Sequence, residues 1–247
     1  MHSRFYAPTL GPGDARVDLP ADESAHALRV LRLKQGAAVR LFNGRGLECA
    51  GIVDVIGREV VAVRVGEPID ITPEPRISLT LAQAVLKGDG MDEVVRDAVM
   101  LGVASVVPVV TVRTETDLRR LAKGARVDRW HRVAVASAKQ CGRSVVPAIN
   151  APVLLATYLE TVKDDLRVIL AEPGAGCGEA GPERLRSLPA PRSVTLLAGP
   201  EGGWTAAETG AAGAAGFLPL PLGRRTLRAD AAAQAAIPVL QFLWGDL

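Results

Sequence analysis

The sequence predicts an α/β protein of two domains, a small β-rich domain over residues 1–72 and a larger α/β domain over residues 73–247. Three observations predict this. Short segments rich in Val and Ile occur within the first 70 residues, Pro73 and Pro75 then interrupt the pattern, and apolar strands alternate with helices in the rest of the chain. A chain of 247 residues accommodates two modest domains. Buried strands that alternate with helices are typical of a mostly parallel sheet covered on both faces.

The first domain is expected to be a small β-barrel or sandwich that carries one helix. The segments with strand character are residues 38–42, 47–56 and 59–65. Asn43-Gly44-Arg45-Gly46 and Gly57-Arg58 separate them, and such residues favour hairpin turns because they tolerate positive φ. The helix is expected to begin with Asp22 as its N-cap, to bury Leu28 and Leu31, and to end at Gly36.

In the second domain, the strands and helices follow from apolar runs and from helical spacing. Strands are expected at residues 77–85, 103–110, 167–172, 193–198 and 216–220, with helices from about residue 89 to 102 and near 128–141. The closing segment from Ala229 to Leu243 is almost wholly apolar, so it must be buried on most sides by its own domain, by a second subunit, or by both. Pro238 within it predicts a bend or a break.

Composition and charge exclude several classes of protein. The formal net charge is only +2, and neither part of the chain is basic overall, so nucleic-acid binding can come only from local clusters of arginine. No apolar run is long enough to span a bilayer, and the N-terminus has no apolar signal region, which predicts a cytoplasmic protein without a membrane partner. Cys49, Cys141 and Cys177 are far apart, which argues against a disulfide framework and against a metal site.

Two glycine-rich loops follow apolar strands. The first, Glu172–Gly178, resembles the nucleotide loop of Rossmann-type enzymes, but such a loop opens its domain, whereas only about 70 residues follow here. A plain flexible turn explains it equally well. The second, Gly199-Pro200-Glu201-Gly202-Gly203, leaves backbone groups open to a ligand, although a tight strand–helix turn has the same composition. Thr205 and Glu208 then form the pattern of a capping box.

A third segment, Leu222-Gly223-Arg224-Arg225-Thr226-Leu227-Arg228, carries three arginines directly before the apolar C-terminal helix. Arginine at a helix N-terminus opposes the helix dipole, so its presence there needs another reason. An anionic partner, such as a phosphate or a developing oxyanion, supplies one.

Four motifs together resemble those of one family. They are GPEGG at 199–203, LGRRTLR at 222–228, KGDGMD at 87–92 with LGV at 101–103, and QCGR at 140–143. In these motifs and their spacing the chain resembles RsmE-type 16S rRNA (uracil-N3)-methyltransferases of the SPOUT superfamily. The similarity covers nearly the whole chain, including Arg4-Phe5 and the segment 26–32. It implies a PUA-like β-barrel domain, a SPOUT α/β domain with a C-terminal trefoil knot, and a homodimer. It also implies S-adenosylmethionine as cofactor and 16S rRNA or the small ribosomal subunit as partner.

The resemblance also implies site residues. The cofactor is expected in three loops, made of Leu170, Ala171, Glu172, Ala198, Gly199, Pro200, Glu201, Gly202, Gly203, Leu222, Gly223, Thr226 and Leu227. Arg228 is the expected catalytic residue, because a fixed guanidinium favours the ionised uracil; a salt bridge at the knot or at a dimer interface is the alternative. Glu201 either attracts the positively charged cofactor or holds its loop by accepting backbone hydrogen bonds. The expected RNA-binding residues are Arg4, His26, Arg29, Arg32, Lys87, Arg143 and Arg225.

The chain departs from the family pattern at two places. Ala229-Asp230-Ala231 replaces Thr-Glu-Thr, which removes two hydroxyl groups, although Asp230 can still cap the helix. Met100 replaces a glutamate of the family pattern, and the carboxylate of that glutamate is therefore not required for the chemistry of this protein. Three alternatives stay open: methylation of another base, methylation of a ribose 2′-hydroxyl, and a non-catalytic RNA-binding assembly factor. For His26, Arg29 and Arg32, a solvated helix face is the alternative to RNA binding.

Overall fold

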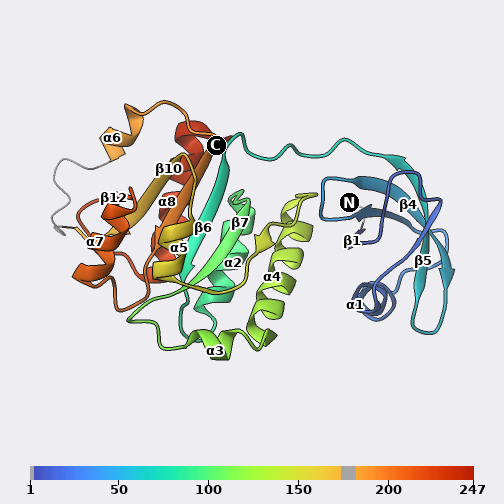
Figure 1. Ribbon diagram of the computed structural model, residues 1–247. Coiled ribbons are helices and arrows are strands. Elements are labelled where there is room, and N and C mark those ends of the chain that lie inside the picture. Colours follow the sequence, from blue (N-terminus) through green and yellow to red (C-terminus); the bar gives the residue numbers. More distant parts are fainter. Residues whose placement is uncertain (1–2, 174–181) are drawn as a thin grey trace. The chain divides into compact units, whose positions relative to one another are not determined.

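The computed structural model describes residues 3–173 and 182–247, which form two compact units (Figure 1). One unit contains the chain up to Glu74 together with Val135–Val146, and the other contains Pro75–Ala134 and Pro147–Leu247. The sequence predicted two continuous domains that meet between residues 72 and 73. The units differ from that division because residues 135–146 pack with the N-terminal part of the chain.

The first unit is built on a five-stranded sheet with the order β1-β3-β4-β5-β2. Its strands are β1 (Ser3–Tyr6), β2 (Arg16–Asp18), β3 (Ala38–Phe42), β4 (Glu48–Ile56) and β5 (Val61–Pro68). The pair β1–β3 is parallel, and the other pairs are antiparallel. The three longer strands are those that the sequence predicted. The sequence analysis missed β1 and β2, which are too short to show a period of two.

The helix of the first unit is shorter than predicted. It consists of α1 (Ala21–Ala25) and a π-helical turn η1 (His26–Val30), and its N-cap is Pro20 rather than Asp22. Leu31 donates its N–H to the carbonyl of His26, five residues back, which is the π-type bond that closes this turn. Arg32 then has φ +50°, so the chain leaves the helix there instead of at Gly36.

The core of the first unit lies between this helix and the sheet. Its members are apolar residues that alternate along the strands or face the sheet from the helix and the N-terminal loop, namely Phe5, Ala7, Leu10, Val17, Leu19, Ala27, Val39, Leu41, Cys49, Val53, Val61 and Val63.

The second unit is built on a parallel sheet with the order β12-β10-β11-β6-β7-β8, and β9 also pairs with β7. The strands are β6 (Ser78–Ala84), β7 (Ser105–Val110), β8 (Ala148–Ile149), β9 (Val153–Leu154), β10 (Leu166–Ala171), β11 (Ser193–Ala198) and β12 (Leu218–Pro221). The mostly parallel sheet and its five longer strands are as predicted. The α/β fold class is therefore confirmed.

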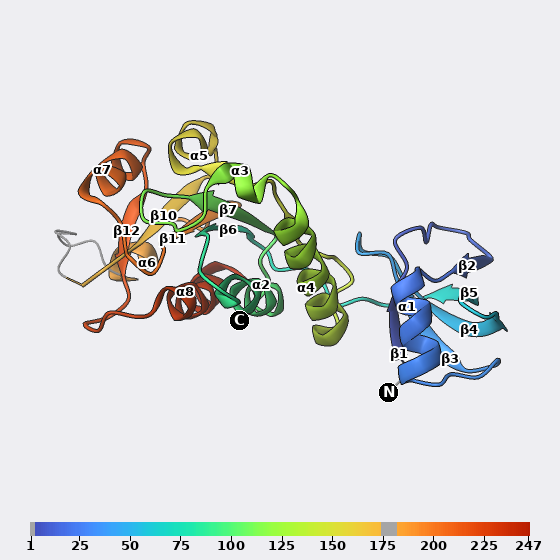
Figure 2. The same cartoon turned by 90° about the horizontal axis from the view of Figure 1, so that it is seen from below.

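Helices cover both faces of this sheet, as the buried strands predicted (Figure 2). They are α2 (Gly90–Met100), α3 (Leu118–Leu121), α4 (Ala125–Cys141), α5 (Leu155–Thr161), α6 (Pro182–Arg186), α7 (Ala206–Ala214) and α8 (Ala229–Trp244). Helices α5 and α7 lie on one face, and α2 and α8 lie on the other. The break predicted at Pro238 does not occur, because α8 continues through it. Within the described ranges, none of the helices is long and apolar enough to cross a membrane.

Candidate functional site

A pocket of about 720 Å³ opens in the second unit where its parallel strands end. The carboxyl ends of β6, β10, β11 and β12 lie at the same edge of the sheet because these strands run in the same direction. This edge is where open α/β sheets bind ligands. The pocket walls are the loops that follow these four strands, closed by the first turn of α8.

Most of the predicted cofactor residues line this pocket, although they come from three separate loops. Those that line it are Leu170, Ala171, Glu172, Gly199, Pro200, Glu201, Gly203, Leu222, Thr226 and Leu227. Ala198, Gly202 and Gly223 do not; Ala198 is fully buried in β11. Arg228, Arg225 and Lys87 share the same walls. Of the first glycine-rich loop, residues 174–178 lie outside the described part of the chain.

Side-chain contacts hold the glycine loop Gly199–Gly203 at its first residue and at its central residue. Glu201 accepts a hydrogen bond from the backbone N–H of Lys87 at 2.9 Å, so this carboxylate does hold the loop, as one of its two predicted roles requires. The Gln83 side chain is fully buried and donates to the carbonyl of Gly199 at 3.3 Å. Its Oε1 has no partner in the described part of the chain. No pattern in the sequence indicated a role for Gln83, which has the context of an ordinary strand residue.

Arg113 is a second residue that the sequence analysis missed. Its Nη1 donates to the carbonyl of Gly202 at 2.6 Å, and its aliphatic carbons pack so closely that a Cβ on Gly202 would lie 3.2 Å from them. At the next position, Gly203 has φ +70°, and a Cβ there would lie 2.8 Å from Glu172 Oε1. Glycine is therefore favoured at 203 by the backbone conformation, whereas the exposed Glu172 side chain could move away from a Cβ.

Trp204 joins two of the three loops. Its indole N–H donates to the carbonyl of Leu170 at 2.9 Å, and the ring lies 3.1 Å from the position of a Cβ on Gly199. The predicted capping box of the next helix is confirmed. The Thr205 side chain accepts from the N–H of Glu208, and the Glu208 carboxylate accepts from the N–H of Thr205. These contacts fix where the glycine loop turns into α7.

The wall after β6 carries several charges. Lys87 forms an ion pair with Glu115 at 2.6 Å, and this hydrogen bond together with the charge of Glu115 raises the pKa of Lys87. Asp89, also in the wall, pairs with Arg129 of α4 at 2.7 Å. Arg126 of α4 donates to the carbonyl of Leu86 at 3.3 Å. The start of α4 thus lies directly behind this wall.

The arginine loop 222–228 is exposed, and its last residue begins α8. Arg228 occupies the N-cap position, but its side chain does not cap the helix. The side chain is 87% exposed, and its Nε donates to Asp230 Oδ1 at 3.3 Å. Asp230, which was expected to cap the helix, instead lies in the first turn and accepts from the N–H of Ala231. A carboxylate at this position interacts favourably with the helix dipole. Asp230 contacts only Nε of Arg228, so the other guanidinium nitrogens stay open to the pocket that Arg228 lines.

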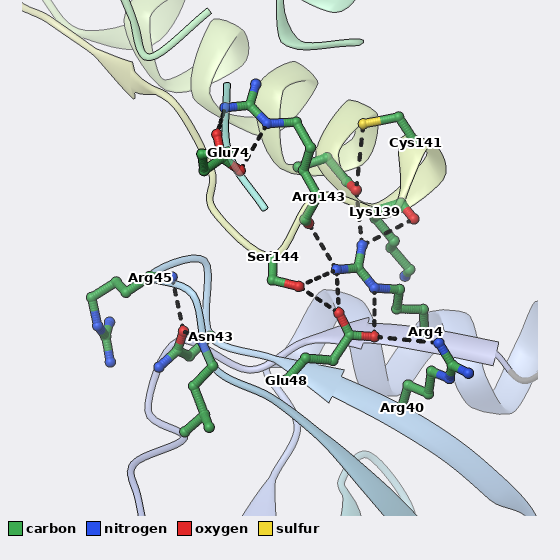
Figure 3. Close-up of polar contacts among 12 residues, drawn as sticks. Arg4, Arg40, Asn43, Arg45, Glu48, Glu74, Lys139, Cys141, Arg143 and Ser144 are labelled. Atoms are coloured by element: carbon green, nitrogen blue, oxygen red, sulfur yellow. Dashed lines mark hydrogen bonds and ion pairs between the residues drawn. The ribbon is translucent and has the colours of Figure 1, made fainter. Parts of the chain in front are cut away.

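Arg4, predicted to bind RNA, is engaged inside the first unit (Figure 3). Its guanidinium forms a two-pronged ion pair with Glu48, at 2.6 and 3.0 Å, and donates to the carbonyl of Ala138 at 2.8 Å. Ser144 also donates to Glu48 at 2.6 Å. Burial alone raises the pKa of the Glu48 carboxyl, but the hydrogen bonds from Arg4 and Ser144 and the charges of Arg4 and Arg40 outweigh it, so the pKa is lowered overall. This arrangement ties residues 135–146 to the sheet.

Arg143, also predicted to bind RNA, is buried and forms an ion pair with Glu74 (Figure 3). Its backbone carbonyl accepts from Arg4 at 2.7 Å, so the two arginines belong to one network. Both arginines were predicted to bind RNA, and nothing in the sequence indicated that carboxylates of the same unit engage both guanidinium groups.

The remaining predicted RNA-binding residues of the first unit lie in different settings. Arg29, in η1, and Arg32, beyond it, are exposed. The sequence predicted one helix as far as Gly36, but the helix ends before Arg32, so Arg32 does not share a helix with His26 and Arg29. His26 is half-buried and packs edge-on against Phe5, with 6.4 Å between ring centroids.

Among residues 3–173 and 182–247, no group of three or more His, Cys, Asp or Glu side chains is arranged to hold a metal ion. Cys177 lies outside these ranges.

Comparison with known families gives two matches. Residues 72–241 match the RNA methyltransferase domain, and residues 19–65 match the RNA methyltransferase PUA domain. Ribosomal RNA small subunit methyltransferase E from Synechocystis is 29% identical, with 93% of this chain and 74% of that protein covered. The protein of the same name from Rickettsia conorii is 27% identical, with 98% and 96% covered.

Solved structures are similar over the full length. A methyltransferase from Legionella pneumophila, solved with its bound cofactor SAM, matches with a TM-score of 0.91 and 32% identity, covering 100% of both chains. Ribosomal RNA small subunit methyltransferase E from Neisseria gonorrhoeae, bound to S-adenosylmethionine, matches with a TM-score of 0.89 and 30% identity, again over 100% of both chains. With the family model covering most of its length, this chain belongs to the RNA methyltransferase family, in which a PUA domain precedes the methyltransferase domain.

Proposed function

We propose that this chain transfers a methyl group from S-adenosylmethionine to N3 of a uridine in small-subunit ribosomal RNA. The observation that carries the proposal is the meeting of three loops, after β10, β11 and β12, in one pocket that also contains Arg228. The names of the curated relatives support the RNA substrate. The proposed place of work is the cytoplasm, where small-subunit RNA is available to a protein of this kind.

The pocket residues fit the proposed cofactor. Its walls combine apolar side chains, such as Leu170 and Leu222, with the exposed backbone of the glycine loop and with the carboxylates of Glu172 and Glu201. Apolar surface suits the adenosine ring, and carboxylates suit positive charge. S-adenosylmethionine, when bound, supplies an electrophilic methyl group on a sulfonium. The glycine loop and the loop after β10 would hold it, because Trp204 fixes these two loops to each other.

The chain's own contribution to the chemistry is positioning and charge. Uracil N3 carries a proton, and its loss leaves negative charge on the two flanking carbonyl oxygens. The exposed guanidinium of Arg228, fixed by Asp230, offers several N–H donors to such an oxygen and so favours the ionised base. Holding the base in line with the methyl group also lowers the activation barrier, by about 7–11 kcal/mol at best.

RNA binding is assigned to exposed cations. Lys87 and Arg225 line the pocket, and Arg29 and Arg32 are exposed in the first unit. Arg4 and Arg143 are left out of the proposed RNA surface, because their side chains are only 11% and 9% exposed in the ion pairs with Glu48 and Glu74, whereas the Lys87 side chain is 53% exposed in its pair with Glu115. Because the target base in folded RNA is stacked or paired, it must be turned out before it reaches the pocket.

The chain is further proposed to act as a homodimer through the end of α8. Phe242 is 71% exposed there, and with Pro238, Val239 and Leu243 it lines a shallow, mainly apolar pocket. An apolar helix end of this kind is typical of a surface that a partner covers. A second copy of the chain presents the same surface to it and makes a two-fold contact.

The proposed function is tested by mapping methyl groups. Small-subunit rRNA and assembled small subunits, each lacking the modification, are incubated with the protein and labelled S-adenosylmethionine, and the modified nucleotide is identified by mass spectrometry. The expected result is one N3-methyluridine. Label on a ribose hydroxyl or on another base would assign a different methyltransferase activity, and cofactor binding without any transfer to either RNA would support a non-catalytic assembly factor.

A further inference from the structure

The segment from Arg119 to Arg132 concentrates positive charge to an unusual degree. It contains six Lys and Arg residues and one acidic residue, Asp128, so its formal charge is +5 in a chain whose total is +2. The rest of the chain is therefore negative, at 2 − 5 = −3. We call these six cations, of α3 and the first half of α4, the basic strip: Arg119, Arg120, Lys123, Arg126, Arg129 and Arg132.

The strip faces solvent. Five of its six members are exposed, and Arg126 is half-buried where it lies over the ring of Trp130. Within the part of the chain that the structure describes, neither Arg119 nor Lys123 has a hydrogen bond or ion pair from its side chain, and Arg120 has only a loose contact with Asp117 at 3.7 Å. Like charges held together on a surface repel one another, so this concentration of cations, in which Arg119 and Lys123 have no side-chain partner among the described residues, calls for an anionic partner.

The strip adjoins the pocket directly. Arg126 contacts the carbonyl of Leu86, and Arg129 pairs with Asp89, and both of these residues belong to the pocket wall after β6. Only residues 122–124 separate α3 from α4 (Figure 2), so Arg119 and Arg120 of α3 and Lys123 between the helices continue this charge along the chain. The arginine loop 222–228 brings cations to the same pocket from a different wall.

From this geometry we propose that the basic strip binds the phosphates of the RNA that flanks the target nucleotide. The proposal rests on the proposed function for the identity of the RNA. A base turned out into the pocket leaves its neighbouring phosphates outside the pocket mouth, and exposed cations beside the mouth are placed to receive them. Arginines three apart on a helix lie about 5–6 Å from one another, which allows successive cations to contact one backbone. RNA is favoured over an acidic protein because the strip begins at the pocket that receives the base.

The test removes three cations that do not touch the pocket wall, in the triple variant R119Q/R120Q/K123Q. Glutamine keeps good helix propensity, so folding is preserved. The control is K163Q/R184Q/R192Q, which removes the same charge from exposed positions of the same unit that lie outside the strip. Affinity for small-subunit rRNA is measured at several salt concentrations, and affinity for S-adenosylmethionine is measured in parallel.

In the strip variant, log affinity is expected to decrease less steeply with log salt concentration. The magnitude of the slope should be smaller by about two to three, since each lost phosphate contact removes about 0.7–0.9. RNA affinity at moderate salt is expected to fall at least about tenfold, with cofactor affinity unchanged. A slope no different from that of the control overturns the proposal. Loss of binding to assembled subunits but not to rRNA also overturns it, because the strip would then contact a ribosomal protein. If the strip variant shows the smaller salt slope but the unaltered protein methylates neither free rRNA nor assembled subunits, the basic strip is supported and the proposed function is refuted. Failure of the basic strip and failure of the proposed function therefore give different results.

Discussion

Arg113 and Gly202 are joined by a hydrogen bond of 2.6 Å from the guanidinium Nη1 to the glycine carbonyl, although they lie 89 positions apart in the sequence. The loop after β7 thereby adds a third contact that holds the glycine loop, besides those made by Gln83 and Glu201. A loop of three glycines has many accessible conformations, and ordering it on cofactor binding costs entropy. Arg113 reduces that cost by holding one conformation in advance, which is preorganisation of a binding site.

Replacing Arg113 by alanine is expected to weaken binding of S-adenosylmethionine about fivefold. The lost bond comes from an exposed side chain, so its worth is about 1 kcal/mol, the usual net contribution of one hydrogen bond. Calorimetric titration measures the affinity. Arg76→Ala, which removes an exposed arginine of the same unit, serves as control and should leave the affinity unchanged. Equal affinities for the two variants would remove Arg113 from the support of the loop.

Replacing Arg228 by alanine is expected to keep cofactor affinity within about twofold but to lower the single-turnover rate at least about 100-fold. The reason is that the guanidinium is assigned to the charge that develops on uracil, an effect of the size seen when one oxyanion donor is removed. Arg224→Ala is the matched control, because Arg224 lies in the same exposed loop but does not line the pocket. Unaltered turnover in Arg228→Ala would favour the salt-bridge alternative for this residue.

The glycine loop and the arginine loop could be predicted because their chemistry is local. Positive φ at Gly203 and the reciprocal bonds of Thr205 and Glu208 involve residues within a few positions of each other. Such contacts leave a pattern in the sequence itself. The carboxyl edge of the sheet then brings the loops together, which follows once the strands are known to be parallel.

Gln83 and Arg113 could not be predicted, because their partners are chosen by tertiary packing. Gln83 contacts a carbonyl 116 positions away, and nothing in a strand sequence indicates such a partner. The same holds for Arg4, whose partner Glu48 is 44 positions away. For the same reason helix periodicity predicted α4 but gave no indication that its last residues pack with the first unit.

The ion pair of Arg4 and Glu48 is expected to make the stability of the first unit depend on pH. The pKa of Glu48 is lowered below its ordinary value of 4.5 in the folded protein, so the stabilisation is present above about pH 4.5 and is lost as the pH falls through the lowered value. At pH 7, Glu48→Gln should lower the free energy of unfolding by about 3 kcal/mol, because it leaves a buried guanidinium without its counter-charge. The difference from the unaltered protein should shrink at pH 3.5.

Amide hydrogen exchange of β3 and β4 measures this effect, since it reports local opening of the first unit. Glu59→Gln, at an exposed turn of the same unit, is the control and should show no difference at either pH. A double variant, Arg4→Met with Glu48→Leu, should be more stable than either single variant, because no charge is then left buried alone. A constant difference between pH 7 and pH 3.5 would show that Glu48 acts through packing instead of through its charge.

Phe242→Asp is expected to convert the proposed homodimer to a monomer. A central aromatic side chain of an interface often contributes 2 kcal/mol or more, so the dimer dissociation constant should rise about 30-fold or more, and the introduced carboxylates would also face each other across a two-fold axis. Sedimentation velocity at several concentrations measures the constant. The control Leu154→Asp places the same charge on another exposed apolar residue of this unit, which lies outside the pocket at the end of α8. If Leu154→Asp dissociates the dimer equally, or if the unaltered protein sediments as a monomer, the end of α8 is not the dimer contact, and its exposed phenylalanine needs a different partner.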